Sequence, residues 1–297
     1  PLSNPLTLTA KQRNLVAATE PLKVSNETDW APIDFAISGM PQGYSVDLLN
    51  LIADMTGLQL RYINGFSWFE LTEKFKKQEL AMLHSVIKTD ETQLLGEFSE
   101  PFLELPYALV TQQGIDPITH IKQLFGKQLA IPTGWSIVDV VKRNYPEIEI
   151  IEMPSTHAIL HAVEEGEVFT ALDSSIILHY TANQFFVNKI QYHEQLDFSP
   201  LKVDTGLHII LSKKNADLIE IINLALANIT PEQKQALQAK WFGEGEKQNL
   251  TTKGTVPFAG LIDLAKNPSD QQRLVQREFN GVTELIYVTP FGDTSTG

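Results

Sequence analysis

The sequence predicts an α/β protein with two lobes, each containing a parallel sheet covered by helices. Short apolar stretches alternate with amphipathic ones along the first part of the chain, and a second round of the same alternation starts after Gly126. The composition agrees, because a 297-residue chain with 43% hydrophobic residues can bury the cores of two ordinary domains. Since parallel strands need crossover connections, this alternation is typical of a parallel sheet with helices on its faces.

The first α/β unit begins with an alternating, strand-like stretch at residues 22–25. Apolar residues then recur at helical spacing over residues 48–55, and Gly57 predicts the end of that helix. Ser67 and Glu70 have the spacing of a capping box, which predicts the start of a second helix. The remaining strands of this unit are predicted at residues 58–63 and 82–86.

The second α/β unit has three strands and three helices in alternation. The strands are predicted at 128–131, 148–152 and 168–172, and the helices at 137–143, 157–165 and 173–180. Pro146 and Gly166 predict the ends of two of these helices. Asp173 follows the third strand, so it is predicted to head the last helix.

Two further helices are predicted after a late strand at residues 207–211. Asn215 is the expected N-cap of the first helix. Thr230 and Gln233 form a second capping box around Pro231, which favours the first position of a helix.

The composition becomes polar after Gly243, which predicts a linker. Residues 247–297 are then expected to contain one helix, at 260–265, and one strand, at 284–288. A segment of this size does not close a core of its own. We expect it to pack on the main body or to open a further domain of a longer protein.

Charge and cysteine content exclude several classes of function. The 23 basic and 36 acidic side chains give a net charge of −13, and nucleic-acid binding needs a basic face. The chain has no cysteine, which excludes disulfides, thiolate metal sites and a cysteine nucleophile. The expected partner is a small molecule rather than a nucleic acid.

Four short motifs in a fixed order resemble a known family. They are Trp-Ala-Pro-Ile-Asp-Phe at 30–35, Gly-Tyr-Ser-Val-Asp-Leu-Leu at 43–49, Phe-Ser-Glu-Pro-Phe at 98–102 and Lys-Trp-Phe-Gly at 240–243. Together they resemble the bacterial extracellular solute-binding proteins of family 3, in their polar amino-acid-binding branch. The resemblance implies the bilobed type II periplasmic binding fold, a Venus flytrap with ligand in the cleft between two lobes joined by hinge strands.

The resemblance also implies a domain organisation. Lobe 1 is expected to comprise residues 22–110 and 203–246, and lobe 2 with the hinge strands residues 111–202. The lead-in at 1–21 is similar to the segment that precedes such domains in membrane sensor kinases. Residues 278–290, within the extension, are similar to a stretch of Cache-type sensor domains, so 247–297 is a candidate start of such a domain.

Only some of the ligand-binding positions of the family are matched in this sequence. The resemblance places Asp173 where family members hold the ligand ammonium, and Ser85 at a ligand-contact position. Thr92 stands where the family has an arginine that binds the α-carboxylate with two parallel hydrogen bonds. Ordinary α-amino-acid recognition is therefore not expected.

The aromatic positions indicate a different ligand. Trp30, Trp68 and Trp135 map to cleft-facing turns of the family fold, and Ser136 follows the last of them. Indole faces attract organic cations, so three indoles with Asp173 predict a cationic or amino-acid-like ligand. The alternatives are that Trp68 and Trp135 are buried helix-start residues and that Asp173 is a simple N-cap.

The predicted function is a periplasmic, small-molecule-binding sensor domain of a membrane-anchored signalling protein, without catalytic residues, metal or cofactor. His157, His161 and Glu165 share a helix face, but no further metal ligand is identifiable. The alternatives are a free transport binding protein, an enzyme such as a dehydratase or lytic transglycosylase, and a cleft that binds nothing. Glu27, Glu70 and Asp173 are the only candidates for an acid–base pair in the cleft.

Overall fold

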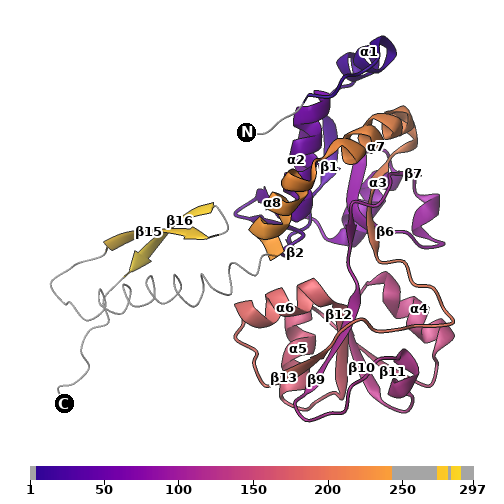
Figure 1. The fold of residues 1–297 in the computed structure, drawn as a ribbon, viewed down its shortest axis with the longest axis vertical. Helices are drawn as coiled ribbons and strands as arrows, with labels where there is room; N and C mark the ends of the chain where they lie inside the picture. The colour runs from indigo at the N-terminus through magenta and orange to yellow at the C-terminus, as the bar shows by residue number, and fades with distance from the viewer. Residues whose placement is uncertain (1–4, 243–272, 280–281, 289–297) are drawn as a thin grey trace. The chain divides into compact units, whose positions relative to one another are not determined.

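The computed structural model describes residues 5–242, 273–279 and 282–288. The chain divides into two compact units, Pro1–Ile229 and Thr230–Gly297. The first unit contains two large sheets, each with its own helices (Figure 1). We call the part around the first sheet lobe 1 and the part around the second sheet lobe 2.

Lobe 1 is built on a six-stranded sheet with the order β5-β1-β6-β14-β7, in which β8 also pairs with β14. The strands are β1 (Leu22–Ser25), β5 (Leu60–Ile63), β6 (Met82–Ile87), β7 (Glu97–Phe98), β8 (Leu103–Glu104) and β14 (Gly206–Leu211). β1 is parallel to β5 and β6, whereas β14 is antiparallel to all its neighbours. A small separate sheet contains β2 (Asp29–Trp30), β3 (Asp34–Ile37) and β4 (Met40–Gln42).

Two helices of lobe 1 begin or end at the residues that the sequence predicts. α2 (Tyr44–Thr56) ends at Gly57, whose φ of 82° is the left-handed conformation that glycine adopts without strain. α3 (Trp68–Lys76) starts with the reciprocal capping box of Ser67 and Glu70. The other helices of this lobe are α1 (Ala10–Ala18), α7 (Ile219–Asn228) and the 3-10 helices Thr92–Leu94 and Lys213–Leu218.

Lobe 2 is built on a five-stranded sheet with the order β11-β10-β12-β9-β13. The strands are β9 (Tyr107–Gln112), β10 (Gln128–Pro132), β11 (Glu149–Met153), β12 (Thr170–Ser174) and β13 (Ile190–His193). The helices are α4 (Ser136–Asn144), α5 (Thr156–Glu164), α6 (Ser175–Gln184) and the 3-10 helix Ile121–Leu124. β10, β11 and β12 are parallel, and β9 runs antiparallel to β12 and β13.

Alternating side chains divide the core of lobe 2 between the two faces of its sheet. Leu109 and Leu129 lie in one apolar cluster with α4. Val110 and Ala130, their immediate neighbours, lie in a second cluster with α5 and α6. Successive residues of a strand point to opposite faces, so both faces of this sheet are buried.

The chain passes from one sheet to the other twice, between β8 and β9 and between β13 and β14. The two crossings are joined where the Leu105 amide donates to the Thr205 carbonyl over 2.8 Å. This arrangement confirms the bilobed α/β fold with hinge strands. The sheets are mixed rather than purely parallel, because β9 and β14 run opposite to their neighbours.

Two local predictions were wrong, and one helix was not predicted. The helix that was not predicted is α1 in the lead-in, which is capped by Thr9 and Gln12 and contains no buried residue. Asp173 lies inside β12, and Ser174 is the N-cap residue of α6. Asn215 lies within a 3-10 helix whose N-cap is Ser212.

The second unit contains α8 (Pro231–Phe242) and an antiparallel pair of strands, β15 (Arg273–Phe279) and β16 (Val282–Val288). The predicted capping box of Thr230 and Gln233 forms in both directions, at 3.2 and 2.9 Å. The strand predicted at 284–288 lies within β16, and β15 was not predicted. The helix expected at 260–265 lies outside the described residues.

Among the helices described here, none is both long and apolar enough to span a lipid bilayer.

Candidate functional site

A cleft of about 1180 Å³ lies between the lobes of the first unit. On the lobe 1 side it is lined by the turn after β1, by α3 and by the segment after β6. On the lobe 2 side it is lined by the N-terminal ends of α4 and α5 and by one face of α6. The segments that follow strands thus supply most of the lining, as is usual for ligand sites of α/β folds.

Trp30 and Trp135 connect the two lobes across this cleft. Their ring centroids are 5.3 Å apart at an interplanar angle of 64°, the edge-to-face geometry that aromatic pairs favour. Trp30 is 8% exposed, and its indole N–H is buried without a hydrogen-bond partner among the described residues. A ligand with an acceptor atom would satisfy this donor.

Two other predicted contacts, Trp68 and Ser136, line the cleft from helix starts. Trp68 opens α3 and also packs partly against the apolar cluster around Leu71. Ser136 opens α4 directly after Trp135, which occupies the N-cap position without a side-chain hydrogen bond. Trp68 is therefore both a lining residue and a partly buried helix-start residue, so the two interpretations of this residue are compatible.

Ser85 lines the cleft from β6, where the strand contains a bulge. Two residues of β6, His84 and Ser85, face Ile209 of β14, and the pairing register shifts there. Ser85 consequently adopts a φ of 61°, which is unusual for a residue with a side chain. Its hydroxyl donates to Ser45 over 2.6 Å and lies 3.0 Å from Nδ1 of His84.

A buried histidine–aspartate pair lies beneath Ser85. His84 Nε2 contacts the Ser25 carbonyl at 2.7 Å and Asp34 Oδ2 at 3.4 Å. Burial lowers the pKa of His84 to about 4 and raises the pKa of Asp34, although Asn26 and the Glu27 amide donate to its carboxylate. Desolvation thus favours the neutral form of both groups, in spite of their ion-pair distance.

This pair is not among the site residues that the sequence predicts. Its signal was a charged residue and a histidine placed within apolar runs, at Ile33-Asp34-Phe35 and in the buried strand that contains His84.

Asp173 lies one side chain behind the cleft. It is 2% exposed and accepts from the Thr156 hydroxyl at 2.7 Å and from the Ser174 amide at 2.6 Å. Burial raises the pKa of Asp173 to about 7, against the effect of these two donors. Thr156 itself lines the cleft, so a ligand at this place would meet the threonine before the carboxylate.

Thr92 lines the cleft where the resemblance would place an arginine, and its hydroxyl is used locally. It accepts from the Thr89 amide and donates to the Ile87 carbonyl, each at 2.8 Å. The side chain thus closes a turn after β6 and offers no fork of donors to a carboxylate.

Acidic side chains dominate the charge of the cleft. Its described lining contains six carboxylates and a single lysine: Glu27, Asp29, Glu73, Glu91, Asp139, Glu152 and Lys76. Lys76 pairs with Glu73 over 2.8 Å, and Glu152 pairs with Lys142 outside the lining. Four carboxylates remain without a described ion pair, which favours a cationic ligand.

Glu27 is a half-buried carboxylate of this set, and its pKa is raised. Desolvation is the main cause that raises its pKa, and the nearby Asp34 and Asp29 add to the effect. A cation bound beside Glu27 would replace its proton, because an opposite charge favours the ionised form.

The histidines of α5 form a group that differs from the one expected. His161, Glu164 and Glu165 have possible metal ligands within 4.8 Å of one another. His157 instead stacks on Phe185, with centroids 3.7 Å apart. His161 and Glu165 are exposed, and such exposed groups occur commonly without a metal.

Comparison with known proteins places this geometry in a family. The model of the bacterial extracellular solute-binding proteins, family 3, matches residues 22–244. The Sensor protein EvgS of Escherichia coli K12 is 26% identical over 241 residues, which are 81% of this chain and 20% of EvgS. The periplasmic VFT2 domain of Bordetella pertussis BvgS superimposes with a TM-score of 0.69 at 20% identity, over 80% of this chain and all of that domain.

An ancestral arginine-binding protein bound to arginine superimposes with a TM-score of 0.63 at 21% identity, over 75% of this chain and 98% of that one. These structures share the fold, and the chain spans about a fifth of the length of EvgS. Because the family match covers both lobes and most of the sequence, the chain belongs to the bacterial extracellular solute-binding proteins, family 3.

Proposed function

We propose that this chain is a periplasmic sensor domain of a membrane-anchored signalling protein, and that a cationic small molecule closes its cleft. The observation that carries the proposal is the cleft itself, in which the Trp30–Trp135 pair joins the lobes beside Glu27. The sequence relation to EvgS supports the signalling context. The sensor and binding proteins among its relatives support a binding role rather than catalysis by this chain.

The charge and the aromatic side chains of the cleft together favour a cation. Unpaired carboxylates attract a cation, and each indole face adds about 0.5 to 2 kcal/mol of cation–π attraction. Thr92 leaves the position of the carboxylate-binding arginine without a guanidinium. An organic amine without a free α-carboxylate therefore suits the lining better than an ordinary amino acid.

Ligand-driven closure requires contacts that exist only when the lobes are together, because only differential affinity shifts an equilibrium. Trp30 and Glu27 lie on the lobe 1 side, whereas Trp135 and Ser136 lie on the lobe 2 side. A ligand that touches both pairs gains its full affinity only in the closed form. Closure would then be the signal passed to the rest of the parent protein.

Calorimetric titration of the full chain with amines, polyamines and α-amino acids tests this function. We expect an amine to bind, and Trp135→Ala and Glu27→Gln each to weaken binding by about 10-fold, the loss of one charged or cation–π contact. Glu70→Gln is the matched control, since Glu70 only caps α3. Equal binding by all variants, or binding of α-amino acids alone, would overturn the cationic assignment.

The free transport protein is the alternative from the same family. A transport role predicts binding without a change in the activity of any attached output domain. Fusion of the chain to its native downstream region, with and without an amine that binds, separates the two: a ligand-dependent output supports the sensor.

A further inference from the structure

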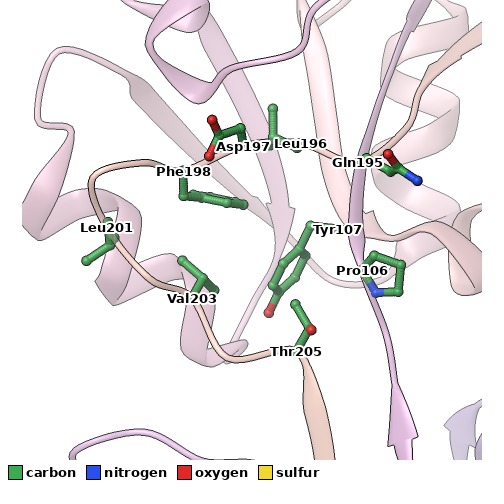
Figure 2. Close-up of a pocket in the computed structure, with 9 residues that line it drawn as sticks. All are labelled: Pro106, Tyr107, Gln195, Leu196, Asp197, Phe198, Leu201, Val203 and Thr205. Atoms are coloured by element: carbon green, nitrogen blue, oxygen red, sulfur yellow. The ribbon is translucent and has the colours of Figure 1, made fainter.

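A second cavity, of about 240 Å³, lies at the hinge (Figure 2). Pro106 and Tyr107 line it from the first crossing between the lobes, and Val203 and Thr205 line it from the second. No residue lines both this cavity and the inter-lobe cleft. The hinge cavity is thus a separate site whose walls come from the two segments that connect the lobes.

The apolar part of the hinge cavity is formed around a ring pair. Tyr107 and Phe198 lie edge to face with centroids 5.8 Å apart, and Leu196 and Leu201 complete this wall. A water molecule occupies about 30 Å³ in the liquid, so the volume equals that of about eight waters. This is the size of a molecule with a single substituted ring.

One polar group in the hinge cavity has no partner among the residues that the structure describes. Tyr107 is 3% exposed, and its hydroxyl makes no hydrogen bond to any residue that the structure describes. Figure 2 shows this hydroxyl directed into the space between Val203 and Thr205. The Thr205 hydroxyl is already used, because it donates to Glu104 over 2.7 Å. This hydroxyl is therefore free to donate to an acceptor atom on a ligand, in place of water.

The charges around the cavity restrict what that ligand can be. Burial first, and then the charges of Asp173 and Asp204, raise the pKa of Tyr107 above its ordinary range, so the phenol remains a donor. Asp197 lies at the rim, and its carboxylate is occupied by the amide and hydroxyl of Ser199 at 2.8 Å. Carboxylates on this side disfavour an anion, and the apolar wall disfavours a desolvated cation.

We propose that the hinge cavity is a regulatory binding site for a small neutral molecule that has an apolar ring and one hydrogen-bond acceptor. Because both crossings contribute walls, relative rotation of the lobes changes the shape of the cavity. An occupant fits one degree of closure better than another and therefore biases the equilibrium between open and closed forms.

Benzamide and benzoate test the chemistry, since they share one ring and differ in charge. Saturation-transfer NMR on the full chain should detect benzamide, with clearly weaker binding of benzoate. Tyr107→Phe keeps the ring and removes the donor, so it should weaken benzamide binding by about 3- to 10-fold, the value of one neutral hydrogen bond. Val203→Phe should fill the cavity and abolish binding. Equal binding of benzoate and benzamide would overturn the assignment of a neutral acceptor.

Trp68→Ala distinguishes the hinge cavity from the cleft, because Trp68 lines the cleft but has no described ring contact across it. Benzamide binding that persists in Trp68→Ala and disappears in Val203→Phe supports the hinge site. The reverse pattern places benzamide in the cleft and overturns the proposal, as does the absence of binding at millimolar concentration. Thermal unfolding of each variant checks that it remains folded, and Tyr107→Phe gives a second test if Val203→Phe does not fold.

A separate measurement tests whether binding in the hinge cavity changes the closure of the lobes. The chain has no cysteine, so Asp54→Cys in α2 and Glu147→Cys between α4 and β11 accept a fluorophore pair on opposite lobes. Benzamide should change the energy transfer between the two labels. Binding without any change in transfer would show that the site is occupied but not coupled to closure, which overturns the regulatory assignment.

Discussion

The indoles of Trp30 and Trp135 meet edge to face at 5.3 Å, although one belongs to lobe 1 and the other to lobe 2. Such a pair contributes about 0.5 to 1.5 kcal/mol beyond the area that it buries. The contact crosses the cleft, so it stabilises the arrangement in which the two lobes meet.

Removal of this contact should open the lobes. In Trp135→Ala we expect a longer mean distance between labels at Asp54→Cys and Glu147→Cys, measured by energy transfer. Trp68→Ala is the matched control, because Trp68 lines the cleft but has no described ring contact across it. If both variants give the wild-type distance, the indole pair does not restrain the lobes.

Thr92→Arg should create affinity for α-amino acids. The guanidinium would supply the two parallel donors that a carboxylate accepts, for an expected gain of about 10- to 100-fold in affinity. The loss of the Thr92 bonds to Ile87 and Thr89 should cost about 1 kcal/mol of stability. Calorimetry with an amino acid and its amide, which lacks the carboxylate, checks the prediction; an equal gain for both would contradict it.

The stability of the protein should fall as pH rises from about 6.5 to about 8. Native Glu27 has a raised pKa, so over this range the native state holds a proton that the unfolded chain has released. The free energy of unfolding then decreases by at most about 1.4 kcal/mol per pH unit for each such group. The pKa of His84 is lowered from 6.5 to about 4, so this residue makes the stability rise with pH, but only below about pH 6.5. It therefore does not contribute over the range considered.

Denaturant unfolding of wild type and Glu27→Gln across this pH range measures the effect. The variant should show a shallower pH dependence, because glutamine does not titrate. Glu70→Gln is the control, since the pKa of Glu70 is lowered by its bonds to Ser67 and lies below the range tested. A slope in Glu27→Gln equal to that of wild type would mean that Glu27 is ionised in the native protein.

Two glycines of lobe 1 should respond very differently to alanine. Gly43 has a φ of 122°, and an added Cβ would lie 2.2 Å from the Ile33 carbonyl oxygen. Gly39 has a φ of 77° but no atom within 4 Å of an added Cβ. Gly39→Ala should therefore cost about 1 kcal/mol of backbone strain, whereas Gly43→Ala should cost more than twice that amount. Denaturant unfolding of both variants checks the order, and equal losses would contradict it.

The fold was predictable because its signals are local and repeated. Gly57 and the Ser67–Glu70 capping box give the bounds of α2 and α3 from interactions within a few residues. The direction of β9 and β14 was not predictable in this way. Whether a strand runs parallel or antiparallel depends on partners far away in sequence, such as Thr111 beside Thr170.

The candidate site was predictable in part. Trp30 and Trp135 were named from the family resemblance, and the structure places both in the cleft lining. The buried His84–Asp34 pair was not found, because no short-range pattern reveals that two residues from different strands approach within 3.4 Å. The Tyr107 hydroxyl was missed for a related reason, since only the folded hinge leaves it without a partner in the described part of the chain.

The pairing of β6 with β14 determines the order in which this protein can fold. Leu83 lies beside Ile210, so the lobe 1 sheet is incomplete until all of lobe 2 has been synthesised. Lobe 2, by contrast, is continuous in sequence from β9 to β13. Closing so long a loop is entropically costly and slows folding. On the ribosome, lobe 2 should therefore become protected from proteolysis before lobe 1, although lobe 1 emerges first.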